Sequence, residues 1–179
     1  MARVLVLLGP PGSGKTTIGE ELGRRGLRWR EWEPVILARW GSREAFVARK
    51  AEALPQLHDE VGRWVAAGGP AAVIETTGLS DAPFLDMLDR DHECLVVRLD
   101  VSRAEARRRV AARARGRHLS DDAGRNDAVW QAVAAGPGAH RRADLVLATD
   151  QRTPADLAEQ ILARCAPPTQ GHPAAGASP

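Results

Sequence analysis

The segment that most constrains the fold of this chain is residues 9–16, which read GPPGSGKT. They fit the P-loop pattern, in which glycines allow consecutive backbone N–H groups to turn inward around phosphate oxygens. Lys15 is placed to reach the outer phosphates of a nucleotide, and the Thr16 hydroxyl to hold Mg²⁺. The apolar run 3–8 is typical of a buried strand and residues 17–25 have helical spacing, which is the strand–loop–helix context of this motif. We therefore expect a nucleoside triphosphate to be bound by Gly9, Pro11, Gly12, Ser13, Gly14, Lys15, Thr16 and Thr17.

Lysine is rare in this chain, since only Lys15 and Lys50 occur among its 25 lysine and arginine residues. An arginine-rich sequence has lysine at the position where a compact point charge suits phosphate groups, which supports the P-loop interpretation. GTPases read guanine through an N-K-x-D element, and Lys50 has no such neighbours. The sequence therefore disfavours a guanine-dependent switch protein.

Length and composition indicate a single globular domain. The chain has 179 residues, a net charge of +2, and two cysteines whose spacing suggests neither a metal site nor a disulfide framework. We expect the domain to span residues 1–165, followed by a disordered tail over residues 166–179, which are rich in proline, glycine and alanine. No signal peptide or membrane-spanning stretch is visible, which predicts a cytoplasmic protein with no membrane partner. A charge of +2 gives little reason to expect nucleic acid as a partner.

Strand-like and helix-like segments alternate along the chain. Clear strands are expected at residues 71–75, 94–100 and 144–148, and a weaker one at residues 27–31. Together with the first strand they predict a five-stranded parallel sheet with helices on both faces, an α/β fold. Ligands of such sheets bind beyond the carboxyl ends of the strands. That rule places one crevice near Gly9, Glu31, Glu75, Asp100 and Thr149.

Seven arginines crowd residues 103–117. One interpretation is a solvated helix face, which suits Arg103 and Arg107 best, and a second is a nucleic-acid patch. A third is a mobile lid over about residues 115–125. In that interpretation Arg117 folds over the transferring phosphoryl group and neutralises its charge.

Several acidic residues are candidates for the chemistry. Glu31 or Glu33 could orient an attacking hydroxyl and accept its proton, although each taken alone also fits a surface carboxylate. Glu75 ends a strand, the usual place for a carboxylate that holds Mg²⁺ through water, although it also fits a simple strand-end acid. The hydroxyl-rich turn that follows it is a candidate acceptor contact, formed by Thr76, Thr77 and Gly78.

Three of the five tryptophans fall within the presumed acceptor region. Aromatic side chains at these positions would either belong to the core or form an apolar wall that stacks against a substrate ring. The three are Trp29, Trp32 and Trp40.

Beyond these residues, the chain resembles the small-molecule kinases of the P-loop superfamily, and in particular the shikimate kinases, over about residues 3–164. Residues 29–33 stand in the place of that family's hydrophobic-x-Asp-x-Asp segment, and residues 117–119 resemble its Arg-Pro-Leu lid. Residues 143–147 and 149–154 resemble its last strand and adenine-flanking loop. The resemblance implies a nucleoside monophosphate kinase-like fold that uses ATP and Mg²⁺, with Arg117 as the lid arginine. It also implies that adenine lies against Arg109, Arg152 and Pro154.

The acceptor half departs from that family's pattern. Glutamates replace both aspartates, Thr76-Thr77-Gly78 replaces a triple-glycine turn, and His118 replaces the lid proline. No arginine is an assured counterpart of the one that holds a carboxylate, although Arg39, Arg43 and Arg49 lie near the right place, and we take Arg43 as the candidate. Residues 74–80 also resemble the polynucleotide-kinase-like group, whose members phosphorylate hydroxyls of varied substrates.

The sequence thus favours an ATP-dependent kinase that transfers the γ-phosphoryl group to a hydroxyl of a small metabolite or natural product. Two alternatives stay open at this point: a nucleoside or nucleotide kinase, and a non-catalytic nucleotide- or RNA-binding module. The expected partner is a small-molecule acceptor, and the expected state is a monomer or weak dimer.

Overall fold

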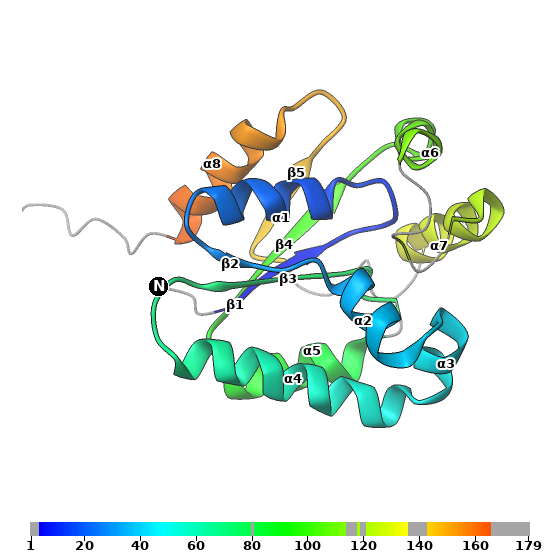
Figure 1. Cartoon of the computed structure of the whole chain (residues 1–179). Helices are drawn as coiled ribbons and strands as arrows, with labels where there is room; N and C mark the ends of the chain where they lie inside the picture. Colours follow the sequence, from blue (N-terminus) through cyan, green and yellow to red (C-terminus); the bar gives the residue numbers. More distant parts are fainter. Residues whose placement is uncertain (1–3, 80, 114–117, 119–120, 136–142, 166–179) are drawn as a thin grey trace, which may run out of the picture.

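The computed structural model describes residues 4–79, 81–113, 118, 121–135 and 143–165. The predicted lid arginine, Arg117, and the predicted tail lie outside the described residues. The described part of the chain alternates strands and helices in a single α/β arrangement (Figure 1). The elements are β1 Val4–Leu8, α1 Lys15–Arg24, β2 Arg28–Trp29, α2 Trp32–Trp40, α3 Arg43–Ala48, α4 Lys50–Ala66, β3 Ala72–Thr76, α5 Ala82–Asp91, β4 Cys94–Asp100, α6 Arg103–Ala112, α7 Ala123–Ala135, β5 Leu145–Ala148 and α8 Pro154–Cys165.

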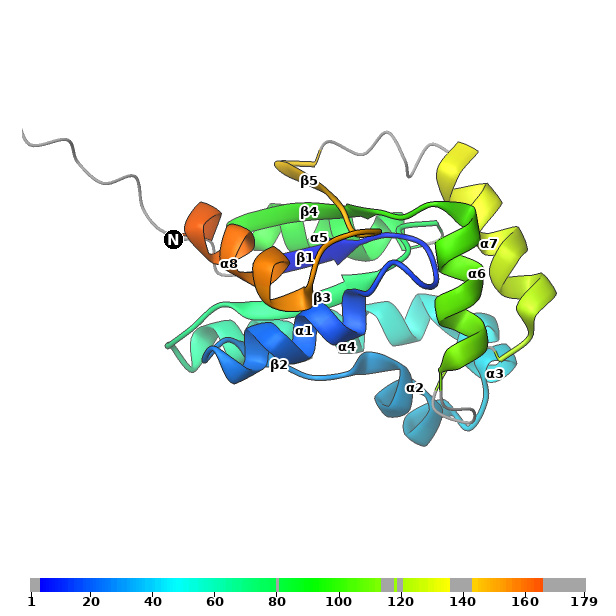
Figure 2. The same cartoon turned by 90° about the horizontal axis from the view of Figure 1, so that it is seen from above.

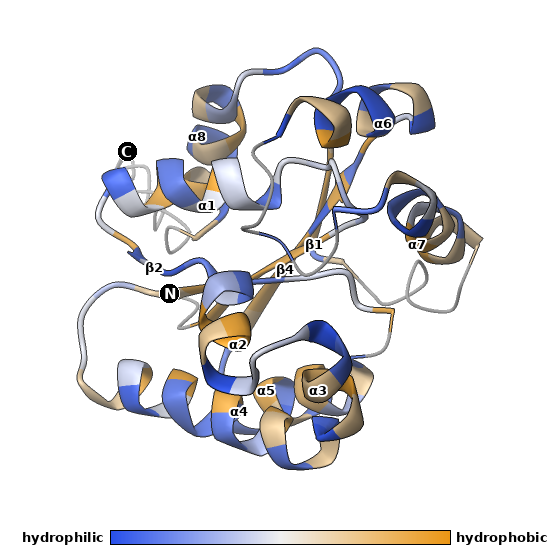
Figure 3. Ribbon diagram, turned by 45° about the vertical axis from the view of Figure 1, so that its right-hand side comes forward, coloured by the Kyte–Doolittle hydropathy of each residue, from blue (hydrophilic) through white to orange (hydrophobic). Residues whose placement is uncertain are grey.

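The strands form one parallel sheet in the order β2-β3-β1-β4-β5, which confirms the predicted fold class. β1 lies at the centre, and all five of its residues are buried because helices cover both faces. Helices α1 and α8 lie on one face, and α4 and α5 on the other (Figure 1). The hydropathy of the residues follows this layering, since the central strands are mostly apolar and the helices carry hydrophilic residues on their outward-facing sides (Figure 3).

Four helices gather at the carboxyl end of the sheet, where β1 leads into the P-loop. α2 and α3 lie on one side of this end, and α6 and α7 on the other (Figure 2). The sequence pattern alone assigns no bounds to α2, α3, α5 or α7. The predicted lid range 115–125 also reaches into α7, because Ala123 already begins that helix.

Arg103 and Arg107 do not form a purely solvated face, because both bind one carboxylate on the neighbouring helix. The Nε atoms of Arg103 and Arg107 lie 2.8 and 2.9 Å from Oδ1 of Asp127. Their terminal nitrogens lie 2.6 and 2.8 Å from Oδ2. Such paired contacts fix guanidinium groups in place, so these two arginines join α6 to α7.

Trp29 of β2 lies against α1, where glycines leave room for its ring. A Cβ atom added at Gly19 would lie 2.4 to 2.6 Å from three ring carbons of Trp29. We expect Gly19→Ala to lower the free energy of unfolding by about 1–3 kcal/mol, although alanine is the better helix former. Gly62→Ala in α4 is the matched control, because a Cβ there would meet nothing within 4 Å. Urea unfolding of both variants measures the difference, and equal behaviour of the two would contradict this packing argument.

Candidate active site

The loop after β1 has backbone conformations and close contacts that require glycine. Gly12 and Gly14 have φ angles of 80° and 90°, a region that side chains rarely adopt. A Cβ atom at Gly9 would lie 2.7 Å from the carbonyl oxygen of Leu99, and one at Gly12 would lie 2.6 Å from that of Ala106. The buried Ser13 hydroxyl has no hydrogen-bond partner among the described residues. The loop is therefore a tight cradle with polar groups available to a ligand.

Lys15 begins α1 and curls back over this loop. Its Nζ donates to the carbonyl oxygens of Gly9 and Pro10 at 2.9 and 3.0 Å. Burial lowers the pKa of Lys15, while the nearby carboxylates of Glu75 and Glu33 raise it. A buried cation held by two carbonyl groups can turn towards an anion that enters the loop.

Thr16 and Glu75 meet beside Lys15. The Thr16 hydroxyl donates to Oε2 of Glu75 at 3.0 Å, and the buried Oε1 atom of Glu75 has no hydrogen-bond partner in the described part of the chain. A hydroxyl and a carboxylate oxygen, next to a phosphate cradle, are the donors that Mg²⁺ prefers when nucleotide oxygens and water complete its shell. These residues therefore fit the ion, which would neutralise phosphate charge there.

Burial also shifts the titration of Glu75. Its pKa rises to about 7 from 4.5, first because of burial, although Lys15 opposes the shift. The folded state therefore binds this proton more tightly than the unfolded chain between pH 4.5 and 7, and stability falls as the pH rises through that window. Without ligands, we expect Glu75 to lower the free energy of unfolding by roughly 3 kcal/mol between pH 4.5 and 8.

Glu75→Gln isolates this effect, because the amide keeps the shape of the side chain and does not titrate. Urea unfolding of the ligand-free protein at pH 5, 6, 7 and 8 should show the wild-type curve falling relative to that of the variant. Parallel curves for the two proteins would contradict the assigned titration.

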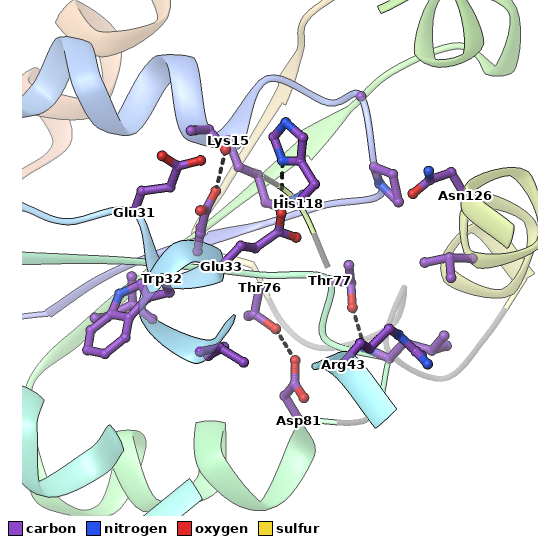
Figure 4. A pocket seen from close by; sticks show the side chains of 18 of the residues that line it. Lys15, Glu31, Trp32, Glu33, Arg43, Thr76, Thr77, Asp81, His118 and Asn126 are labelled. Atoms are coloured by element: carbon purple, nitrogen blue, oxygen red, sulfur yellow. Dashed lines mark hydrogen bonds and ion pairs between the residues drawn. The ribbon is translucent and has the colours of Figure 1, made fainter. Parts of the chain in front are cut away.

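The second group of site residues comes from α2 and from His118. Glu31 occupies the N-cap position of α2 without a side-chain capping hydrogen bond, and Glu33 lies in the first turn of this helix. Oε2 of Glu33 lies 2.9 Å from Nδ1 of His118 (Figure 4). Both glutamates line the same cavity as Lys15 and Thr16. The structure therefore places the two candidate general bases in one cavity with the residues predicted to bind phosphate and Mg²⁺.

The turn after β3 forms another wall of the cavity. Thr76 donates to Asp81 and accepts from the backbone N–H of Gly78 at 3.0 Å, and Lys50 pairs with Asp81 at 2.6 Å. Gly78 has a φ angle of 71°, and a Cβ there would lie 2.5 Å from the side chain of Leu8. Thr77 lines the cavity, whereas Gly78 shapes the turn without lining it.

The three candidate tryptophans have different environments. Trp32 lines the cavity, is buried, and lies 5.6 Å from Trp64 between ring centres. Trp29 packs against α1 on the opposite face of the sheet, and Trp40 packs against Phe46 outside the lining residues. Of the three tryptophans considered for a wall of the acceptor site, only Trp32 therefore lines the cavity.

Only one of the three arginines considered for a carboxylate lies at the cavity. Arg43 lines it (Figure 4). Arg39 pairs with Glu60 at 3.3 Å, and Arg49 pairs with Glu52 at 2.8 Å, both outside the lining residues.

Of the three residues expected near adenine, only Arg109 lies beside the P-loop. Arg109 donates to the carbonyl oxygens of Gly12 and Thr149 at 3.3 and 2.8 Å, which places it beside the P-loop. Arg152 is exposed and donates to Gln160 at 2.9 Å, and the exposed Pro154 begins α8. Neither of these two lines the described cavity.

The cavity also contains residues that the sequence pattern does not single out. Its volume is about 530 Å³, enough for a nucleotide end and a small acceptor. The additional polar lining residues include Glu20 of α1 and four residues from the end of α6, from α7 and from the turn before α5. These four are Arg113, Arg125, Asn126 and Asp81. For Arg125 and Asn126, the only indication in the sequence is that they lie in the polar run 121–127. Such a run is also typical of an ordinary surface loop.

Within the parts of the chain that the structure describes, no helix combines the length and apolar character needed to cross a membrane. No group of three or more potential metal ligands from histidine, cysteine, aspartate or glutamate occurs there either.

Comparisons with known proteins agree with this geometry. The family model described as shikimate kinase matches residues 11–166. A shikimate kinase from Xanthomonas axonopodis pv. citri is 33% identical over 178 residues, covering 90% of this chain and 91% of the relative. A shikimate kinase from Stenotrophomonas maltophilia is 30% identical over 180 residues with the same coverage.

Solved structures show the same fold at lower identity. A shikimate kinase from Acinetobacter baumannii in complex with shikimate has a TM-score of 0.65 at 20% identity, covering 92% of this chain and 93% of that one. A sugar kinase from Janibacter sp. has a TM-score of 0.60 at 21% identity, covering 91% and 94%. The P-loop and the Thr16–Glu75 pair agree with these matches, which extend over most of the chain. The chain therefore belongs to the shikimate kinase family and is an ATP- and Mg²⁺-dependent phosphotransferase that acts on a hydroxyl of a small molecule.

Proposed function

We propose that the reaction takes place between Lys15 and Glu33, and that Glu33 is the group that accepts the proton of the acceptor hydroxyl. The observation that carries this proposal is that both residues line one cavity and that Glu33 lies near enough to raise the pKa of Lys15. The hydroxyl oxygen forms a bond to the γ-phosphorus, the bond from that phosphorus to the ADP oxygen breaks, and the proton passes to the Glu33 carboxylate.

The remaining residues have supporting roles in this proposal. Lys15 leaves its two carbonyl partners and neutralises charge on the transferring group. Thr16 and Glu75 hold Mg²⁺, and His118 orients the Glu33 carboxylate through their 2.9 Å contact. Arg117 remains the proposed lid arginine.

Glu33 is favoured over Glu31 as the base. Glu33 contacts His118 and shifts the pKa of both Lys15 and Glu75, and its effect on the pKa of Glu75 is larger than that of Glu31. A carboxylate that is held in place and close to the phosphate-binding lysine is better suited to proton transfer.

The test is phosphoryl transfer by the purified full chain with Mg²⁺ and ATP. Shikimate is the reference acceptor because the relatives' names give it, and the panel also contains shikimate esters, neutral cyclic diols and nucleosides. We expect acceptor-dependent ADP release and a phosphomonoester signal in ³¹P NMR. Nucleotide binding without acceptor-dependent release on any of these compounds would contradict the proposal and favour a non-catalytic module.

A further inference from the structure

Lys50, the second of the two lysines in this chain, has no part in the proposed reaction and stands where its own helix does not favour a cation. It is the first residue of α4, and the amino end of a helix carries the positive end of the helix dipole. Its Nζ atom lies 2.6 Å from Oδ1 of Asp81, and the two side chains are only 19% and 22% exposed. The contact is therefore not a solvated surface pair, and Asp81 accounts for a lysine at this position.

Asp81 also departs from the usual role of its position. It is the N-cap residue of α5, where an aspartate carboxylate ordinarily accepts from a backbone N–H in the first helical turn. Within α5, which the structure describes throughout, this carboxylate makes no such capping contact. Its Oδ2 atom accepts from the Thr76 hydroxyl instead (Figure 4), while Oδ1 contacts Lys50. Both oxygens thus join Asp81 to other elements.

Thr76 extends these contacts into the turn that follows β3. Its hydroxyl oxygen accepts from the backbone N–H of Gly78 at 3.0 Å, so a continuous chain of contacts links Lys50 to this amide. Gly78 also lies against β1, since a Cβ atom there would lie 2.5 Å from the side chain of Leu8. The turn is therefore held at Thr76 by side-chain contacts and at Gly78 by close packing.

Thr77 lies between these two fixed residues and depends on both of them for its position. It lines the cavity, whereas Lys50 lies outside the lining residues. The backbone up to Thr76 is fixed independently, because β3 pairs with β1 and the carbonyl oxygen of Thr76 accepts from the N–H of Gly9 at 3.1 Å. Glu75 therefore keeps its place beside the P-loop without Lys50. Loss of this lysine should affect the turn and leave the donor half in place.

We propose that Lys50 and Asp81 are positioning residues that hold the turn after β3 in the conformation that presents Thr77 to the acceptor. The proposal rests on the kinase function above, because it assigns this wall of the cavity to the acceptor. Lys50 acts through Asp81 and Thr76 and does not itself touch the acceptor. A small displacement of this wall is enough to slow the reaction, because the acceptor hydroxyl is then poorly placed for attack.

Lys50→Met removes the charge and keeps a side chain of similar length. With Mg²⁺, ATP and shikimate as the acceptor, we expect kcat/KM for shikimate to fall about 10- to 100-fold, whereas the KM for ATP changes less than about 2-fold. If another compound of the panel is the better acceptor, it replaces shikimate in this assay. Lys50→Arg should recover kcat/KM to within about 3-fold of wild type, because it restores a cation next to Asp81.

Arg49→Met is the matched control for Lys50→Met. Arg49 is the preceding cation at the start of the same helix, and it pairs with the exposed Glu52 at 2.8 Å outside the cavity. This variant should leave both constants unchanged, since a surface ion pair contributes little. A loss in Arg49→Met equal to that in Lys50→Met would show a general effect of charge at the start of α4 and would overturn the proposal.

Asp81→Asn tests whether the two residues act as a unit. The amide can still accept from the Thr76 hydroxyl, but the ion pair with Lys50 is lost. The double variant, with Lys50→Met and Asp81→Asn combined, should be no more impaired than the more impaired single variant. Losses that multiply would show that the two residues act independently, which contradicts the proposal.

Hydrogen exchange of the Gly78 amide, followed by NMR on ¹⁵N-labelled protein, reports on the turn without any acceptor. Lys50→Met should speed this exchange at least about 10-fold, because the Thr76 hydroxyl that binds the amide is less firmly held. The amide of Val73, within β3, should exchange at the wild-type rate. Faster exchange at both positions would indicate damage to the whole fold and would contradict a local role in the turn.

The outcomes separate this inference from the proposed function. A wild-type kcat/KM in Lys50→Met, or a rise in the KM for ATP as large as the loss in kcat/KM for the acceptor, would overturn the positioning role and leave the kinase function intact. If no compound of the panel is phosphorylated, the proposed function fails and the Gly78 amide decides the inference. Unchanged exchange then overturns it, and faster exchange confined to the turn supports it.

Discussion

Lys15→Ala should lower kcat by about 10³-fold, because the variant loses the buried cation that is placed to neutralise the transferring phosphoryl group. The folded protein should tolerate the change. Burial lowers the pKa of Lys15, which means that the fold disfavours its charged form, so the melting temperature should stay the same or rise. Steady-state kinetics with varied ATP and a thermal melt of the same preparation measure the two effects.

Arg24→Ala is the control for Lys15→Ala, because Arg24 is an exposed cation on the same helix that pairs with Glu21 at 2.5 Å. This variant should keep wild-type turnover, since a surface ion pair contributes little. Lys15→Arg should not restore activity, because a planar guanidinium does not replace a compact ammonium at this position. Turnover by Lys15→Ala within 10-fold of wild type would rule out the proposed charge neutralisation.

Glu33→Gln should lower kcat by about 10²- to 10⁴-fold, the usual contribution of a positioned general base. The amide keeps the size of the side chain and its ability to contact His118, so the KM for ATP should change little. The same acceptor-dependent assay of ADP release measures the effect. A fall in kcat without a change in ATP binding distinguishes proton transfer from damage to the fold or to the P-loop.

Glu31→Gln is the matched comparison, since it removes a carboxylate from the same cavity two residues earlier. We expect a loss of less than about 10-fold, because Glu31 has a weaker electrostatic effect than Glu33 on Glu75 in the donor half. The reverse order, with Glu31→Gln the more damaged variant, would transfer the role of base to Glu31. Full turnover by both variants would remove a general base from α2 altogether.

The sequence predicts the donor half well because its determinants are contiguous. The P-loop carries its own glycines, lysine and threonine, and the flanking strand and helix follow from local apolar spacing. Glu75 is also accessible from the sequence, because a carboxylate at the end of a buried parallel strand must lie at the carboxyl edge of the sheet.

The acceptor half depends on packing between distant segments. Trp29 and Trp32 are three residues apart, yet Gly19 of α1 accommodates the first on one face of the sheet, while the second lines the cavity on the other. Arg103 and Arg107 look like solvated charges until α7 brings Asp127 against them. Sequence spacing contains no information about such partners, because they lie 20 or more positions away.

By itself, the sequence determines that this chain forms a parallel α/β sheet and holds a nucleoside triphosphate at residues 9–16, because a local motif contains both the backbone conformation and the charge that phosphates require. Only the tertiary structure decides what surrounds the acceptor. It brings Val47 of α3, Leu79 of the turn after β3 and Glu33 of α2 to one cavity. The physical reason is that a binding wall is formed by side chains from several elements, whose proximity is fixed by the packing of the core.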